Sequence, residues 1–299
     1  MMHLLGQRLL RAGNSGRRRR LPGRRFGVDL AGLVIIAVIA FPLYWMVISA
    51  LKPRTAIEAG DTTPYPAKVT LESIRRVVVG DAFWLYLANS LIVALSVVVL
   101  STFCAFLAAV ALTRYRFGSR TKLLIMILVA QMVPVEALTI PLFFLVRNIG
   151  GVVPGLGLNH LGSLIAVHTA FTLPLAIWML RGFVAAVPTE IEEAARLDGA
   201  SSLTFVWRVL FPIVAPGVVA VSVFSFIAAW NDFLFAMTFI ISATERQTLP
   251  VAILRFFQPD GNDWGAIMAG SVLMTIPVLI FFVLVQRRLT SGMAGAVKG

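Results

Sequence analysis

Residues 189–199 combine charged and small side chains in a spacing that suits binding to another protein. They lie between two apolar stretches and begin with a cluster of carboxylates, which a helix dipole stabilises at its first turn. A helix here would present Ile191, Ala194, Ala195 and Leu197. Such a short amphipathic helix fits a groove on a partner. The alternative is a plain surface helix that tightens a turn between apolar stretches.

Both ends of this helix carry recognisable signals. Thr189 followed by Glu192 predicts a capping box at the start. Gly199 is placed to end the helix in a left-handed conformation, which costs other residues more. Ser201 and Ser202 can cap a second short helix. The first helix is too short to be stable alone in water, so it depends on contacts with the rest of the chain or with a partner.

Polar side chains inside the apolar stretches form a second set of candidates. An ionisable group at membrane depth costs about 3 kcal/mol and is a functional candidate by default. A pathway for a hydroxylated solute would need such groups beside aromatic rings. The predicted pathway residues are Asn89, Gln131, Glu136, His168, Trp230, Asn231 and Asp232, with Phe233 and Phe235 as further rings.

Each pathway candidate also has a structural interpretation. Glu136 could pair with a helix end or with Arg147. His168 could be a hydrogen-bonded contact between helices. Asn231 and Asp232 could cap the external end of the fifth span. These alternatives stay open at the level of sequence.

The composition indicates a membrane protein. The chain has 299 residues, of which 59% are hydrophobic and 13% charged, whereas soluble domains have about 45–50% and about 25%. The net charge of +12 is better explained by basic residues flanking membrane spans than by nucleic-acid binding. The single cysteine, Cys104, cannot form an internal disulfide, and no metal-ligand spacing occurs.

Six stretches are long enough to cross the hydrocarbon core, which takes about 20 helical residues. Several contain prolines, which are expected to kink them, and their continuous apolar character excludes a β-barrel. We therefore predict an all-α transmembrane fold with six helices. The predicted spans are 30–51, 86–112, 123–146, 161–185, 209–241 and 266–286.

Lys and Arg predict the orientation and the organisation of the chain. Most of the 26 basic residues fall on the side that holds both termini and the 188–212 loop, so this side is expected to be cytoplasmic. The first span is too long for a cleaved signal peptide. The predicted segments are a disordered basic tail (1–26), a first helix with an external loop containing short helical pieces (27–84), a membrane domain (85–286) and a cytoplasmic tail (287–299).

The segment from Glu193 onward matches the EAA signature, which is Glu-Ala-Ala, three residues, Gly, nine residues, an aliphatic residue, any residue, an apolar residue and Pro. Val209-Leu210-Phe211-Pro212 supplies its end, where Ile-x-Leu-Pro is usual. Shorter elements recur in order along the chain. They are Phe41-Pro42, Leu51-Lys52-Pro53, Asn89-Ser90, Arg114-Tyr115-Arg116-Phe117, Ile140-Pro141-Leu142, Leu173-Pro174, Trp230-Asn231-Asp232 and Gly295-Ala296-Val297-Lys298-Gly299.

With these motifs the chain resembles the carbohydrate-uptake permeases of ATP-binding-cassette (ABC) importers, close to the six-span subunit of the maltose system. The resemblance implies a type I importer permease in the bacterial cytoplasmic membrane, pairing with a second homologous permease, two ATPase subunits and an extracytoplasmic solute-binding protein. It implies that the EAA helix fits a cleft on an ATPase subunit. The residues implied in this coupling are Glu193, Ala194, Ala195 and Gly199, with Glu192 and Asp198 beside them.

The chain carries no G-x-x-x-x-G-K-[ST] phosphate loop. Gly150-Gly151 and Gly155-x-Gly157 resemble one weakly and are better explained as turns. We therefore expect no catalytic residue and no cofactor on this chain, with ATP and Mg²⁺ bound by the partner ATPase subunits.

Three other functions would each account for part of the sequence. A permease for amino acids or polyamines would share the EAA loop but not the other elements as a set. A stand-alone secondary transporter would show inverted repeats and an ion-coupled acidic pair at mid-membrane, for which Glu136 alone is thin support. A non-transporting scaffold would not explain the prolines and polar groups inside the spans.

Overall fold

The computed structural model describes residues 22–80, 82–259 and 261–296. Within these ranges all regular secondary structure is helical, which confirms the all-α fold. Five helical spans are long and apolar enough to cross a membrane, or six if a sharply bent pair counts as one span. The long helices are α2 (Pro22–Leu51), α5 (Phe83–Arg114), α8 (Leu161–Ala186), α11 (Phe211–Trp230) and α14 (Trp264–Ala296).

The predicted continuous third span, 123–146, is wrong. The chain forms α6 (Arg120–Ala130), then the short η2 (Val135–Leu138) and α7 (Thr139–Gly150), and the two halves meet at 89°. The break falls at 131–134 because Pro134 has no backbone N–H and restricts the residue before it. Pro141 lies in the first turn of α7, where a missing N–H costs little.

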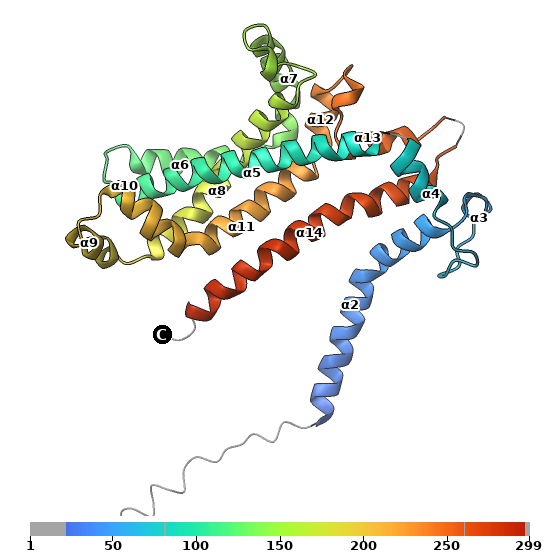
Figure 1. Ribbon diagram of the computed structural model, residues 1–299, viewed down its shortest axis with the longest axis horizontal. Helices are drawn as coiled ribbons and strands as arrows, with labels where there is room; N and C mark the ends of the chain where they lie inside the picture. Colours follow the sequence, from blue (N-terminus) through green and yellow to red (C-terminus); the bar gives the residue numbers. More distant parts are fainter. Residues whose placement is uncertain (1–21, 81, 260, 297–299) are drawn as a thin grey trace, which may run out of the picture.

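Helix α5 is the centre of the bundle and packs against α8 and α11, with the three running side by side in Figure 1. Fully buried small residues, Ala94, Ala105 and Ala109, let the helices approach closely. Ser101 donates to Ser225 across 2.9 Å in the middle of the α5–α11 contact. The bundle core divides into two apolar clusters, one around Trp230 and the other beneath residues 187–210.

The two ends of the bundle carry different short elements (Figure 1). The end we call the α9 end holds α9 (Thr189–Leu197), α10 (Ser202–Thr204) and the π-helix η4 (Phe205–Leu210). The end we call the α4 end holds α3 (Arg54–Glu58), α4 (Glu72–Arg75) and the π-helix η1 (Arg76–Gly80). The short helical pieces expected after the first span are thus confirmed.

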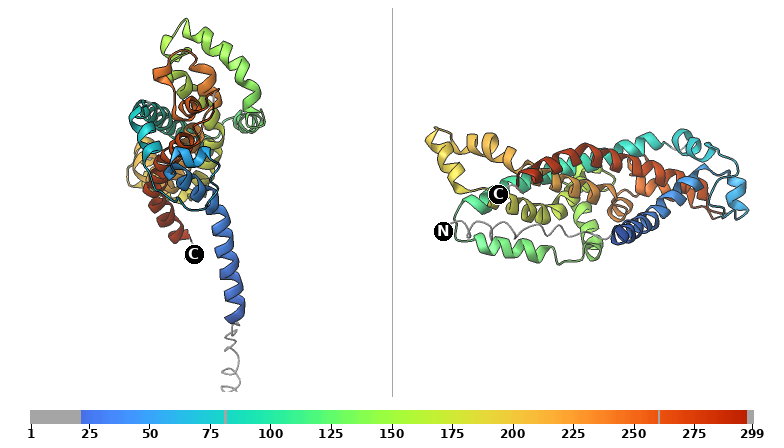
Figure 2. Two further views of the ribbon diagram at one scale, coloured as in Figure 1. Left: turned by 90° about the vertical axis from the view of Figure 1, so that its right-hand side faces the viewer. Right: turned by 90° about the horizontal axis from the view of Figure 1, so that it is seen from below.

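Helix α2 packs against α14 and α4 and then swings away from the bundle toward its N-terminus (Figures 1 and 2). Only 6% of its apolar window is buried within the chain. It begins at Pro22, so residues 22–26 are helical and not disordered as predicted, while 1–21 lie outside the described residues. Likewise α14 continues to Ala296, beyond the predicted tail boundary at 287, and 297–299 are outside the described residues.

Buried polar contacts hold the loops at the α4 end. The ammonium of Lys52, only 2% exposed, donates to the carbonyls of Asp61 at 2.9 Å and Thr63 at 2.8 Å. Asp263 accepts from Arg76 and from the backbone N–H of Ala266 at the start of α14. The connection after α2 is therefore attached to the first turn of α14.

Asn159, just before α8, attaches the α7–α8 connection to the segment after α12 (Leu234–Phe239). Its side-chain oxygen accepts from the backbone N–H groups of Ile241 and Ser242 at 2.8 Å each. Arg246, in η5 (Thr244–Arg246), donates to the Asn159 carbonyl at 2.7 Å. Asn159 adopts a positive φ of 60°, which asparagine tolerates better than most residues.

Three short elements remain, of which the first contacts α7 and α8 and the other two lie beside α5 and α14. They are η3 (Pro154–Leu156), α13 (Leu249–Ala252) and η6 (Ile253–Phe256). Gly150 and Gly157 lie in backbone contact, since a Cβ on Gly150 would lie 2.6 Å from the Cα of Gly157. The interpretation of the glycine pairs as parts of turns is confirmed by η3 and the turn at 151–152.

Candidate functional site

Helix α9 stands at one end of the bundle, between the end of α8 and the start of α10 (Figures 1 and 2). Its two faces differ. Ile191 and Ala195 pack against the apolar cluster beneath 187–210, so they support the helix rather than project outward as the sequence analysis proposed. Glu193, Ala194 and Leu197 are exposed, and Leu197 is 89% exposed. The helix thus has a seated face and a free face of mixed charged and apolar character.

The predicted capping box is wrong. Pro188 occupies the N-cap position, and no side chain caps the first turn of α9. Glu192 instead accepts from Arg196 at 2.7 Å, one turn along the helix, and faces Arg114 of α5. Its side chain is 18% exposed, because the seated face of α9 turns it toward the bundle.

Arg114, the last residue of α5, is a site residue whose role the sequence analysis missed. Its guanidinium donates to the carbonyls of Val184 at 3.3 Å and Val187 at 2.8 Å, at the end of α8. Its Nε lies 3.7 Å from Glu192 Oε2, and its side chain is 8% exposed. One cation therefore joins three helices, satisfies two helix-end carbonyls and neutralises a carboxylate of α9. The available signal was an arginine directly at the end of an apolar span.

The predicted end of α9 is confirmed. Gly199 has φ +81°, and Ala200 N–H donates to the Ala195 carbonyl at 2.9 Å, as in a glycine-ended helix. Asp198 occupies the C-cap position and is exposed. Ser201 then caps α10, accepting from the Thr204 N–H at 3.2 Å.

An aromatic cluster lies next to α10 and seats the following turn. Trp207 stacks on Phe103 of α5 with ring centroids 6.1 Å apart, and it contacts Phe106 at 5.5 Å and Phe211 at 5.7 Å. Aromatic pairs of this kind are worth about 1 kcal/mol beyond their area burial. The segment that connects α9 to α11 is thereby fixed to the middle of the bundle.

Two predicted pathway residues are committed to the protein's own structure. Asn89 is 6% exposed, and its amide donates to the carbonyls of Glu245 and Gln247 at 2.9 Å each. Trp230 is 1% exposed, stacks on Phe226 and donates from its indole nitrogen to the Met274 carbonyl at 3.2 Å. Asn89 thus holds the segment 245–247 against α5, and Trp230 holds the end of α11 against α14.

His168 and Asp232 lie together between α8 and the start of α12. His168 Nε2 is 3.1 Å from Asp232 Oδ2, and the two side chains are 8% and 9% exposed, although the angle is not that of a hydrogen bond. Asp232 also accepts from the backbone N–H groups of Phe235 at 3.2 Å and Ala236 at 2.9 Å. It therefore caps α12 rather than the end of α11, where Asn231 takes the C-cap position.

Gln131 and Glu136 lie at the bend between α6 and α7, and both are exposed. Glu136 forms no ion pair within the described ranges, so the pairing with Arg147 considered from the sequence is not present there. The bend thus places two polar side chains outside the bundle core, apart from the His168–Asp232 pair.

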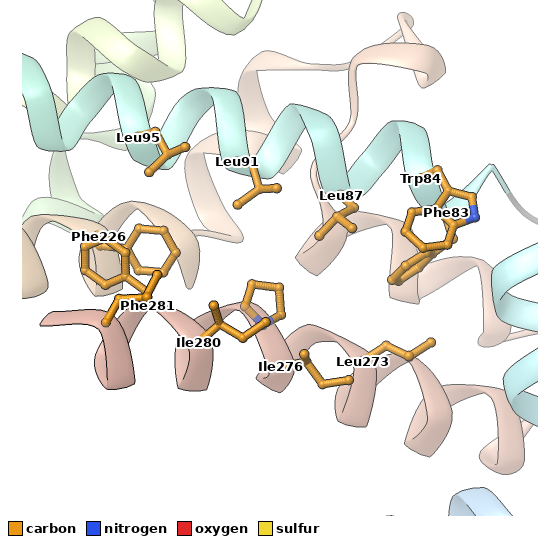
Figure 3. A pocket seen from close by; sticks show the side chains of 12 residues that line it. Phe83, Trp84, Leu87, Leu91, Leu95, Phe226, Leu273, Ile276, Ile280 and Phe281 are labelled. Carbon is orange, nitrogen blue, oxygen red and sulfur yellow. The ribbon is translucent and has the colours of Figure 1, made fainter. Parts of the chain in front are cut away.

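Two cavities along α14 differ in chemistry. The first, about 390 Å³, lies between α5 and α14 and is lined by apolar and aromatic side chains such as Leu87, Leu91 and Phe281 (Figure 3). It offers almost no partner for a hydroxyl group. The second, about 360 Å³, brings together Trp230 and Asn231 with hydroxyl-bearing residues of α14. Its lining residues are Leu43, Met46, Trp230, Asn231, Ser271, Met274, Thr275 and Val278.

Comparison with known proteins identifies the family. Residues 98–295 match the family model of the binding-protein-dependent transport system inner membrane component. The chain belongs to this family. It is therefore a multi-pass permease subunit of an ABC importer in the cytoplasmic membrane, and the resemblance drawn from the EAA signature is confirmed.

Relatives of the permease match it over nearly its whole length. It is 39% identical to the diacetylchitobiose uptake system permease protein DasC of Streptomyces coelicolor, covering 91% of this chain and 96% of the relative. It is 34% identical to the trehalose transport system permease protein SugB of Mycobacterium tuberculosis, covering 89% and 95%. The trehalose/maltose transport system permease protein MalG of Thermococcus litoralis is also 34% identical, with coverage of 90% and 96%.

A solved structure shares the permease fold. In a crystal structure of a bacterial ABC transporter involved in the import of the acidic polysaccharide alginate, one chain superposes with a TM-score of 0.75 at 22% identity. The alignment covers 88% of this chain and 96% of that chain. The type I importer arrangement expected from the sequence is thus confirmed at the level of fold.

Proposed function

We propose that this permease carries a sugar or sugar-like solute, most simply a disaccharide or short oligosaccharide. The relatives that match over nine-tenths of the chain are named for diacetylchitobiose, trehalose and maltose uptake. The cavity beside Trp230 supports this proposal because it places an amide, two hydroxyls and an aromatic edge around one space, a combination that suits hydroxyl groups and sugar C–H faces.

The second part of the proposal concerns how ATP hydrolysis is coupled to transport, and it rests on the free face of α9. We infer that Glu193, Ala194 and Leu197 contact an ATPase subunit, with Gly199 and Asp198 ending the contact surface. Ile191, Ala195 and Glu192 hold the other face of α9 against the bundle. A displacement that a partner imposes on the free face would therefore be transmitted to the bundle. ATP and Mg²⁺ would be bound by two ATPase subunits, and this chain would have no ATPase site of its own.

The orientation and assembly follow from this coupling. The α9 end and both termini would face the cytoplasm, since ATP is used there, and the α4 end would face outward toward a solute-binding protein. A second, homologous permease would complete the pore. Only 6% of the apolar window of α2 is buried within the chain, so its surface is available to a second permease or to lipid.

Uptake by the reconstituted transporter tests the proposal. Proteoliposomes holding the permease, its partner permease, the ATPase subunits and the solute-binding protein would be given labelled diacetylchitobiose, trehalose, maltose, an amino acid and a polyamine. ATP-dependent uptake of a sugar is expected. Glu193→Ala should abolish uptake while insertion is normal, and Glu245→Ala, an exposed carboxylate at the opposite end, should have no effect. Full uptake by Glu193→Ala would reject the coupling role, and uptake of the amine-bearing solutes alone would reject the sugar.

A further inference from the structure

Two buried hydrogen-bond donors near the α9 end of α8 have no acceptor within the described part of the chain. They are Nε of Arg181 and the indole nitrogen of Trp178. The guanidinium carbon lies 5.3 Å from the centre of the indole ring. Positions three apart share a helix face, so both donors belong to one patch of α8, next to the face that Ile177 and Leu180 bury in the core.

The charge of Arg181 also lacks full compensation inside the chain. A guanidinium stays protonated in any protein environment. The Arg181 side chain is half-buried, with its Nε shielded and its cation over the Trp178 ring, so its charge is only partly compensated. The ion pairs at this end join Arg114 and Arg196 to Glu192, and within the described ranges none reaches Arg181. An acceptor from outside the chain is therefore expected at this position.

The position of the pair along α8 suggests the source of that acceptor. Arg181 lies in the last turns of the span Leu161–Ala186, at the depth where a membrane helix leaves the hydrocarbon. Tryptophan concentrates at this interface, and arginine extends toward the phosphate level. Gly182 follows with no atom within 4 Å of where its Cβ would stand, so there is open space beside the pair.

Further cations surround the same end. Leu123 and Leu124 of α6 pack on the cluster that contains Leu180 and Val184, which brings the start of α6 beside the end of α8. Three cations lie in the sequence between the end of α5 and these leucines. They are Arg116, Arg120 and Lys122, and they form no ion pair within the described residues. Residues 113–125 and 161–187 contain no Asp or Glu, and the carboxylates of this end lie on the next element, α9, and at its C-cap. A group of cations on α6 and α8 attracts anionic headgroups, whereas a single partner carboxylate would neutralise only one of them.

We propose that Arg181 and Trp178 form a binding site for the phosphate of an anionic phospholipid. The guanidinium donates to phosphate oxygens in the geometry that suits its planar fork, and the indole N–H donates to a phosphate or ester oxygen. The acyl chains lie along the apolar surface of α8 and α6. The lipid site takes no part in the proposed solute transport. A failure of the lipid experiment would therefore leave the proposed function unchanged, and the reverse also holds.

Lipid retention by the assembled transporter tests the site. The full-length chain, purified with its partner subunits, would be equilibrated with micelles containing equal phosphatidylglycerol and phosphatidylcholine, then exchanged into lipid-free detergent and examined by native mass spectrometry. Wild type should retain phosphatidylglycerol. Arg181→Gln should lower retention about ten-fold, as expected from losing one charge-assisted hydrogen bond. Trp178→Phe should lower it less, and Arg208→Gln, an exposed arginine of η4, should behave as wild type.

Several results would overturn the proposal. One is equal retention by wild type and Arg181→Gln. Another is displacement of the lipid by millimolar inorganic phosphate, which would indicate a site for free anions. A third is retention by the isolated chain but not by the assembled transporter, which would indicate that another subunit covers the patch. If Arg181→Gln fails to fold, Arg181→Lys and Trp178→Phe serve in its place. Arg181→Lys keeps the charge but loses the planar guanidinium, and Trp178→Phe keeps an aromatic ring but loses the indole N–H.

Discussion

Arg114 and Glu192 connect α5, the central helix of the bundle, to α9, with Arg114 Nε 3.7 Å from Glu192 Oε2. The same guanidinium satisfies two carbonyls at the end of α8. Helix α9 is too short to hold its own shape in water, so its position is set by this cation and by the seated residues Ile191 and Ala195. A movement of α9 is thereby passed to both α5 and α8.

Replacing Arg114 should loosen α9 without unfolding the bundle. In Arg114→Ala, Glu192 and the carbonyls of Val184 and Val187 lose their charged partner, a loss of about 1.5–3 kcal/mol. We expect faster hydrogen exchange across 189–197 and ATP-driven uptake reduced at least ten-fold. Arg196→Ala is the matched control, because it removes the other, 61% exposed partner of Glu192 and should cost only about 0.4 kcal/mol. Equal effects of the two variants would contradict a special role for Arg114.

Gly199 should tolerate only residues that accept a left-handed backbone. An added Cβ would meet no atom within 4 Å, so the cost arises from its φ of +81° and not from a clash. Gly199→Val should cost about 1–2 kcal/mol and uncouple ATP hydrolysis from uptake. Gly199→Asn should retain most of the uptake, because asparagine enters this conformation readily. If both variants transport equally well, the backbone conformation at the end of α9 has no bearing on coupling.

Asp232 should act on stability rather than on solute affinity. Asp232→Ala removes the acceptor for two backbone N–H groups of α12, which costs about 1 kcal/mol, and separates His168 from its carboxylate. The thermal unfolding temperature of the assembled transporter should fall, while KM for the sugar stays within two-fold. Asp232→Asn, which keeps one acceptor oxygen, should be milder. A large rise in KM at unchanged unfolding temperature would instead support the solute contact proposed from the sequence.

The loop after α2 should respond to acid through Asp61. Hydrogen bonds from the Thr63 hydroxyl and then from the Thr63 backbone N–H lower the pKa of Asp61 below its ordinary value of 3.8. A lowered pKa means that this contribution to loop stability is complete above pH 3.8 and is lost as pH falls through the lower value. An NMR titration of the Thr63 amide should show this late transition. In Thr63→Val the transition should move up toward 3.8, and an unchanged midpoint would contradict the assignment.

Most spans could be predicted from the sequence because each depends only on a long apolar run. The fifth, predicted at 209–241, instead ends with α11 at Trp230 and is separated from α12. The break in the third span could not be predicted. Pro134 and Pro141 indicate distortion, but the 89° angle depends on how α6 packs along α8 and how α7 contacts α12 and η3. A local pattern contains none of these contacts.

The structure around α9 was predicted in part. Gly199 and Ser201 act through neighbouring backbone, so local sequence was enough to place them. Glu192 was misassigned because its partner, Arg114, comes from a distant helix and competes with the local capping box. The pathway residues show the same limit. The sequence identified Asn89 and Trp230 as polar groups in apolar surroundings, but it could not reveal the loop and helix carbonyls that accept their hydrogen bonds.

Asn159 ties together two connections that are far apart in the sequence. Because a single amide oxygen is bound by the backbone of Ile241 and Ser242, and Arg246 holds the Asn159 carbonyl, the entry to α8 and the exit from α12 cannot be displaced separately. We expect the two connections to move together, and α8 continues to the carbonyls that Arg114 holds beside α9. A displacement at the Asn159 connection would therefore reach α9 along a single helix, and Pro174 in the middle of α8 is a position where bending can absorb part of it.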